Sequence, residues 1–252
     1  MIRRVALCIV SAGLISCSGP TVIGPDKACS YQRIVVLSLL PQKVRYRRVQ
    51  AGGKEESLDI PVGMLLNEAA WTGVRAAFRS DEGRELVIFT EDLEHYRQKL
   101  EAVKFGVAVR DIREELVAFA AARNADAVLL LSRYIHSNRG IRGIDGLFYL
   151  GLGDKQYVTA SADVWIELYD RNGQGIVESR SEGVLIPVKR VDGASWTFDL
   201  RRDTDVVGHR SFTQTWQRVL PRVIEARIQR MGLPCSKGTQ LGDLKAEDYA
   251  RA

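Results

Sequence analysis

The sequence predicts an α/β protein of the mixed α+β kind, with a single mixed β-sheet of about five strands flanked by helices. Short apolar runs rich in β-branched residues alternate with longer segments whose apolar residues recur every three or four positions. These are the patterns of buried strands and amphipathic helices. A strict alternation of apolar and polar residues comes only late, at 157–169, and predicts an antiparallel hairpin. The expected order is β-α-β-α-α-β-β-β-α.

The first half supplies the strands that helices connect, so these strands are expected to be parallel or mixed. In chain order, we expect a strand at 33–40, a helix at 61–79, a strand at 85–89, helices at 91–104 and 111–124, and a strand at 127–135. The polar stretch 42–60 is expected to be a long loop or a marginal edge hairpin.

The second half contains the predicted hairpin, formed by 157–169 and 176–188, and a last amphipathic helix at 209–231 that Pro221 should kink or split. The segment 136–156, which directly precedes the hairpin, is rich in glycine and is expected to be a flexible loop. This loop carries four consecutive apolar residues, Leu147, Phe148, Tyr149 and Leu150. We expect them to be exposed and to contact a partner or the membrane. The alternative is that the loop folds back and caps the core.

The amino-terminal residues resemble the signal peptide of a bacterial lipoprotein. Arg3 and Arg4 precede an apolar run of about ten residues, too short to span a bilayer. The run ends in Leu14-Ile15-Ser16-Cys17, which is similar to a lipobox. The resemblance implies cleavage before Cys17 and attachment of lipid to its thiol, and Ser18 in the next position points to the outer membrane. The alternative is an ordinary secretory signal in which Cys17 is incidental.

These signals divide the chain of 252 residues into a signal peptide at 1–16, a flexible tether at 17–28, one α/β domain at 29–235 and a polar tail at 236–252. Removing Arg3 and Arg4 lowers the formal charge from +5 to +3. An excess this small is weak evidence for nucleic acid, and we expect no nucleic-acid partner. No apolar run of about 18 residues follows Cys17, so no transmembrane helix is expected in the mature chain.

Two cysteines remain once Cys8 and Cys17 are assigned to the signal peptide and the lipid. Cys29 directly precedes the first expected strand, and Cys235 directly follows the last helix. Because an even pair in an oxidising compartment favours a disulfide, we expect a Cys29–Cys235 bond. The alternative is two free thiols. Neither cysteine has a second ligand at a metal-binding spacing, so neither a metal nor a cofactor is expected.

No recognised catalytic motif occurs in the sequence. The three histidines, His95, His136 and His209, belong to different elements and are expected at the surface or at helix ends. Asp163 and Glu167 fall on the same face of the strand expected at 157–169. This pair could serve in acid–base chemistry, although charges on a strand face are usually only solvated.

The order of elements, the lipobox and two phrases, Asn124 to Leu131 and Ala162 to Asp170, resemble a group of envelope lipoproteins. The group shares the fold of the amino-terminal domain of TolB and includes curli secretion lipoproteins and penicillin-binding-protein activators. The resemblance covers residues 34–231 by order of elements and implies the same fold. Secretion-channel members carry two long amphipathic hairpins, and 136–156 is too short and too rich in glycine to supply them.

The sequence therefore predicts a lipid-anchored protein of the cell envelope, facing the periplasm from the outer membrane. We expect a non-enzymatic binding or assembly role with an envelope protein as partner. The alternatives are a transport accessory that binds lipid or hydrophobic cargo, and a cell-wall hydrolase that uses Asp163 and Glu167. The oligomeric state is left open.

Overall fold

The computed structural model describes residues 22–49, 55–102, 109–133, 147–152, 157–162, 164–172, 175–179, 185–187 and 206–235. In chain order, the elements are α1 (Pro25–Ser30), β1 (Arg33–Ser38), β2 (Lys43–Val49), β3 (Glu55–Pro61), α2 (Leu65–Ala77), β4 (Glu85–Phe89), α3 (Leu93–Ala102), α4 (Val109–Ala121), β5 (Ala127–Arg133), β6 (Leu147–Leu152), β7 (Tyr157–Ala162), β8 (Val164–Asp170), β9 (Gly175–Ser179), β10 (Leu185–Pro187) and α5 (Val206–Arg230).

The first sheet is the mixed five-stranded sheet that the sequence predicts. Its strand order is β4-β1-β5-β8-β9. β1 runs parallel to both β4 and β5, while β8 runs antiparallel to β5 and β9. The apolar residues of β1 are fully buried, as expected for a strand covered on both faces.

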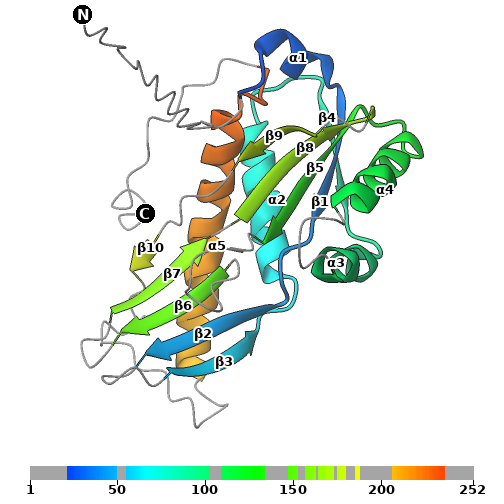
Figure 1. Cartoon of the computed structure of the whole chain (residues 1–252). Coiled ribbons are helices and arrows are strands. Elements are labelled where there is room, and N and C mark those ends of the chain that lie inside the picture. The colour runs from blue at the N-terminus through cyan, green and yellow to red at the C-terminus, as the bar shows by residue number, and fades with distance from the viewer. Residues whose placement is uncertain are drawn as a thin grey trace, which may run out of the picture.

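A second five-stranded sheet, in the order β10-β7-β6-β2-β3, was not predicted. The segment expected as one strand at 157–169 is divided between β7 of the second sheet and β8 of the first (Figure 1). The return segment 176–188 is divided in the same way between β9 and β10. The alternation of apolar and polar residues continues through the division at residue 163, so the periodicity does not reveal the change of sheet.

Two stretches expected to lack regular structure belong to this second sheet. Of the two alternatives for 42–60, the edge hairpin is correct, since β2 and β3 pair antiparallel over seven residue pairs. The expectation of a flexible loop is wrong for 147–152, which forms β6 between β2 and β7. Its aromatic and aliphatic residues favour a strand once neighbouring strands are present on both sides. Their contact with a partner stays a prediction.

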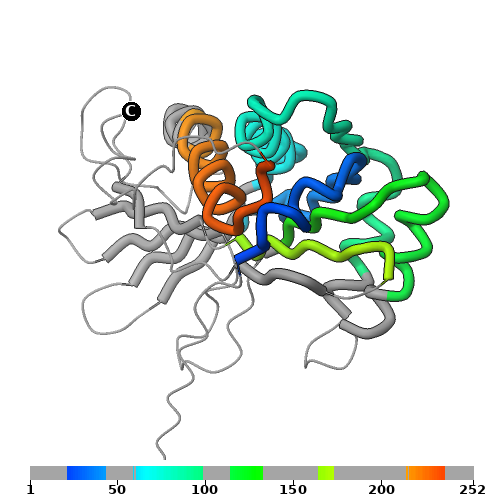
Figure 2. Tube along the Cα trace, turned by 90° about the horizontal axis from the view of Figure 1, so that it is seen from above, coloured from blue at the N-terminus to red at the C-terminus, as the bar shows by residue number. Residues whose placement is uncertain are grey.

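Helices cover both faces of the first sheet, with α2 and α5 side by side on one face and α3 and α4 on the other (Figures 1 and 2). α5 is one continuous helix, and Pro221 does not split it. Gly73 lies where α2 and α5 cross, and a Cβ atom on it would lie only 2.8 Å from the Cβ atom of Ile224. The helices can therefore approach this closely only because residue 73 has no side chain. None of the described helices is both long and apolar enough to cross a membrane.

Candidate functional site at the amino end of β1

The first described residues of the chain pack against the end of its last helix. Ile23 is buried, and its backbone N–H donates to the carbonyl of Met231 at 2.9 Å. α1 follows at once and buries Ala28 completely. The expectation of a flexible tether over 17–28 is therefore wrong for 23–28, because Ile23 is held to the end of α5 and Pro25–Ser30 form a helix that buries Ala28. Val22, just before them, remains 62 % exposed.

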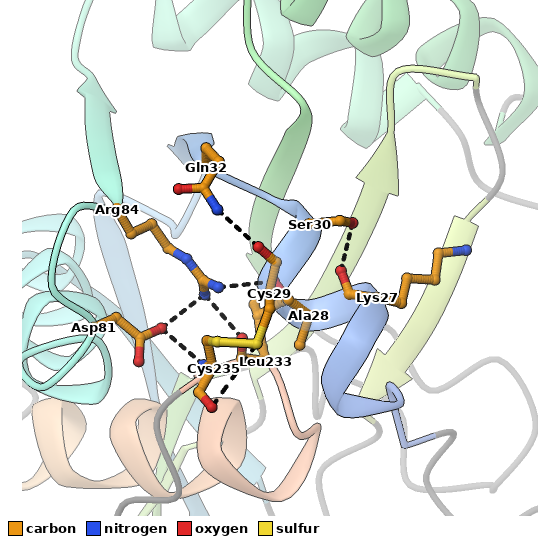
Figure 3. The surroundings of a disulfide bond; sticks show 9 residues. All are labelled: Lys27, Ala28, Cys29, Ser30, Gln32, Asp81, Arg84, Leu233 and Cys235. Atoms are coloured by element: carbon orange, nitrogen blue, oxygen red, sulfur yellow. Dashed lines mark hydrogen bonds and ion pairs between the residues drawn. A yellow bond between two sulfur atoms is a disulfide. The ribbon is translucent and has the colours of Figure 1, made fainter.

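A disulfide joins Cys29 in α1 to Cys235 beyond α5, with the two Cα atoms 4.8 Å apart (Figure 3). This is the bond that the sequence analysis predicts. It forms because α5 ends beside α1, so that two positions separated by 206 residues meet at the amino end of β1.

A buried ion pair lies directly against the disulfide. The side chains of Asp81 and Arg84 approach to 2.9 Å and are only 2 % and 4 % exposed. The Arg84 guanidinium also donates to the carbonyls of Ala28 at 2.7 Å and Leu233 at 2.9 Å. The Asp81 carboxylate accepts the backbone N–H of Cys235 at 2.8 Å. Figure 3 shows the Arg84 side chain reaching toward Ala28 and Leu233, so the two segments that the disulfide joins are also held by polar contacts.

We call this group the terminal clasp, defined by Ala28, Cys29, Asp81, Arg84, Leu233 and Cys235. Burial lowers the pKa of the Arg84 guanidinium, and the Asp81 carboxylate opposes that shift. An arginine remains charged at any physiological pH, so the positive charge of the pair persists inside the clasp. The cysteine pair can be predicted from the sequence and the ion pair cannot, because Asp81 and Arg84 stand in a polar turn where exposed charges are normal.

A second set of contacts fixes the entry into β1. The Asp126 carboxylate accepts the backbone N–H groups of Gln32 at 2.9 Å and Arg33 at 3.0 Å. The Gln32 side chain donates to the carbonyl of Cys29 at 2.8 Å. Asp126 reaches this position from the turn before β5, where Asn124 adopts a left-handed conformation with φ of 50°. The end of α1 and the amino ends of β1 and β5 are thus held together.

Tyr31 lies between α1 and β1 in the chain and is 4 % exposed. Its hydroxyl has no hydrogen-bond partner among the described residues. Burial and, to a smaller extent, the negative charge of Asp170 raise the pKa of Tyr31 to about 12. The neutral phenol is therefore the form that the folded protein favours.

The opposite end of β1 is held differently. The Asn67 side chain, fully buried in α2, accepts the Leu40 backbone N–H at 3.1 Å and donates to the Leu40 carbonyl at 3.2 Å. Arg97 of α3 donates to the same carbonyl at 3.5 Å and forms an ion pair with Glu94. The carboxyl end of β1 is thus fixed by hydrogen bonds from helices on both faces of the sheet.

The residues singled out from the sequence do not meet in one place. Cys17 and Asp163 lie outside the described residues, as does His136. Leu147, Phe148, Tyr149 and Leu150 are in the second sheet, far from α1 in Figure 1. Glu167 accepts a hydrogen bond from the Tyr169 hydroxyl at 2.7 Å, and His95 lies 3.1 Å from Glu115. The described residues contain no group of three or more histidine, cysteine, aspartate and glutamate side chains placed to hold a metal ion.

No protein-family model matches the chain, and no curated protein matches it. Solved structures similar to it include the C-terminal domain of LpoB from Salmonella enterica, at 15% identity over 62% of this chain and 90% of that one, with a TM-score of 0.25. Lipoprotein GNA1162 from Neisseria meningitidis is 15% identical over 74% of this chain and 95% of that one, with a TM-score of 0.23. The hypothetical protein CT253 from Chlamydia trachomatis is 11% identical over 78% and 98%, with a TM-score of 0.28. TM-scores this low do not establish a shared fold or function.

Proposed function

We propose that the protein is a lipoprotein of the bacterial cell envelope, attached to the membrane through Cys17, that acts without catalysis as a binding or assembly component of an envelope complex. The observation that carries this proposal is how soon folded structure begins after the lipobox. Val22 is five positions after Cys17, and Ile23 is already buried.

This spacing sets the distance between the domain and the lipid. A fully extended chain spans about 3.5 Å per residue, so five residues reach about 18 Å at most. The domain would therefore work at the membrane surface, and a freely ranging domain would need a longer linker. A protein held this way is suited to act on other components of the same membrane.

The disulfide supports an extracytoplasmic location, because such bonds persist in oxidising compartments. Ser18, by the resemblance to lipoproteins, supports the outer membrane with the domain facing the periplasm. The proposal needs no cofactor, metal or nucleic acid. The alternative function, a cell-wall hydrolase, gains no support from Glu167, because its carboxylate accepts a hydrogen bond from the Tyr169 hydroxyl.

The predicted partner contact lies on β6. This strand pairs with β2 in a register that sets Phe148 beside Arg45 and Leu150 beside Arg47. Apolar and basic positions therefore neighbour each other in the second sheet, and we propose that an envelope protein binds there.

A photocrosslinking amino acid placed at Tyr149 in intact cells tests this function, with the same group at the exposed Arg75 of α2 as the matched control. We expect an identified envelope protein to crosslink from residue 149 and not from residue 75, and the yield to fall in a Cys17→Ser variant of equal abundance. Equal crosslinking from both positions, or a yield that does not depend on Cys17, would contradict the proposal.

A further inference from the structure

The two edges of the first sheet differ in how they are protected against pairing with another strand. β4 and β9 are its outermost strands. The β8–β9 ladder contains an irregularity at Leu168 and Tyr169, and β9 begins with a glycine. β4 instead stays in register with β1 over five consecutive residue pairs. Bulges, prolines and charged side chains, lysine above all, are common means of blunting an edge strand; β4 has no bulge, proline or lysine, and its one charged residue is Glu85 at its first position.

The backbone of β4 offers hydrogen-bonding groups on its outer side. The Glu85 N–H donates to the Gln32 carbonyl at 2.8 Å, which sets Glu85, Val87 and Phe89 to face β1. Backbone groups alternate in direction along a strand, so the N–H and C=O groups of Leu86 and Ile88 point away from β1. Among the described strands, β4 pairs with β1 alone.

The side chains of β4 suit a strand that pairs on both sides. Leu86, Val87 and Ile88 pack against the core and yet are only partly buried, whereas Phe89 is buried. A neighbouring strand with aliphatic residues would cover the remaining apolar surface of these three side chains.

Exposed carboxylates stand at both ends of β4. Glu82 and Glu85 are exposed at its amino end, and Glu91 and Asp92 are exposed at its carboxyl end. Glu85 is paired with Arg33 at 3.0 Å, while its side chain remains 56 % exposed. A strand with basic residues at its ends would therefore meet charges of opposite sign.

We propose that β4 accepts an extended segment of a partner protein as an additional strand of the first sheet, and that this segment carries aliphatic residues in its middle and lysine or arginine at its ends. The inference rests on the proposed function, in which the protein binds another envelope protein. Strand addition gives affinity through backbone hydrogen bonds and specificity through the side chains.

The same charges disfavour a second copy of this chain as the occupant. Antiparallel pairing of β4 with its own copy would place Glu82 and Glu85 of one chain near Glu91 and Asp92 of the other. Like charges that face each other across a strand pair are destabilising.

The test uses the mature chain with Cys17→Ser, so that binding does not depend on acylation. The probe is a synthetic peptide of alternating valine and threonine with lysines at both ends, and the same peptide with glutamates at its ends is the control. We expect the lysine peptide to bind at least about tenfold more tightly and to protect the Leu86 and Ile88 amides from hydrogen exchange.

Ile88→Pro and Ile88→Ala form a matched pair of variants. Both lose the isoleucine side chain, but only proline removes the outward N–H, which β1 does not use. We expect the proline variant to bind the lysine peptide at least about tenfold more weakly than the alanine variant. If the proline variant does not fold, Glu82→Lys with Glu91→Lys replaces it and should reverse the preference between the two peptides.

Three results would overturn the proposal: equal binding by the proline and alanine variants, equal binding of the two peptides, or no binding of either. A dimer that Ile88→Pro dissociates would show instead that a second copy occupies the edge. None of these results bears on whether Cys17 is acylated, so failure here is distinct from failure of the proposed anchor.

Discussion

The two ends of β1 are held by different means. At its amino end the terminal clasp combines a disulfide with the buried Asp81–Arg84 pair. At its carboxyl end the Leu40 backbone is held by hydrogen bonds from Asn67 and Arg97. The covalent bond is thus at the end nearest the proposed lipid anchor, and the non-covalent contacts are where the chain leaves for the second sheet.

This difference indicates a division of mechanical roles. If Cys17 carries lipid, as we propose, a force on that lipid would enter the domain at Val22 and would reach α1 within a few residues. The disulfide would pass that force to the end of α5, and Arg84 would pass it to the turn before β4.

Removal of the disulfide should have the largest effect. For a loop of 206 residues, the chain-entropy model gives a loss of about 5 kcal/mol at most in the free energy of unfolding. We expect Cys29→Ala with Cys235→Ala to approach this loss in denaturant titrations. The wild-type chain in reductant is the control and should match the double variant; a loss below about 1 kcal/mol would show that the clasp depends little on its covalent bond.

Arg84→Met should come next, with a loss of about 3–5 kcal/mol, because it leaves the Asp81 carboxylate buried without its cation and frees two carbonyls. Arg79→Met is the matched control, since Arg79 is exposed in the same turn, and should change the free energy of unfolding by about 0.5 kcal/mol or less. Equal effects of the two variants would show that Arg84 does not stabilise the terminal clasp.

Asn67→Ala should cost less, about 1–3 kcal/mol, because it leaves the Leu40 N–H without its partner at the other end of β1. The control is Glu68→Ala on the exposed side of α2. Combined with the double cysteine variant, the loss should be additive to within about 0.5 kcal/mol if the two ends are independent. A departure from additivity larger than about 0.5 kcal/mol would show that the two ends of β1 are not stabilised independently.

The ionisation of Tyr31 should have no effect on stability at neutral pH and should act only in alkali. Its folded pKa of about 12 exceeds the ordinary value of 10.0, so its contribution to stability is complete below pH 10 and is lost as the pH rises towards 12. Relative to Tyr31→Phe, the wild-type free energy of unfolding should fall over this range. Parallel pH curves for the two proteins would show that the phenol titrates normally.

The disulfide of the terminal clasp can be predicted from the sequence, because a cysteine pair at the two ends of a domain strongly indicates such a bond. The first sheet is equally predictable from its continuous apolar runs, such as β1. The burial of the Asp81–Arg84 pair cannot be predicted, since a polar turn gives no sign that α1 and the residues after α5 will cover it. The second sheet escapes prediction because β7 and β8 share one unbroken alternation, and because β6 is too short and too close to glycines to be distinguished from a loop.

We propose that Cys17 carries the lipid and that the folded domain begins a few residues beyond it. Mass spectrometry of the amino-terminal peptide from membrane-extracted protein tests this claim directly. We expect a mature chain that begins at Cys17 and carries a diacylglycerol thioether, and a Cys17→Ala chain that lacks the modification and leaves the membrane fraction. An unmodified Cys17 thiol, together with unchanged membrane fractionation of Cys17→Ala, would contradict it.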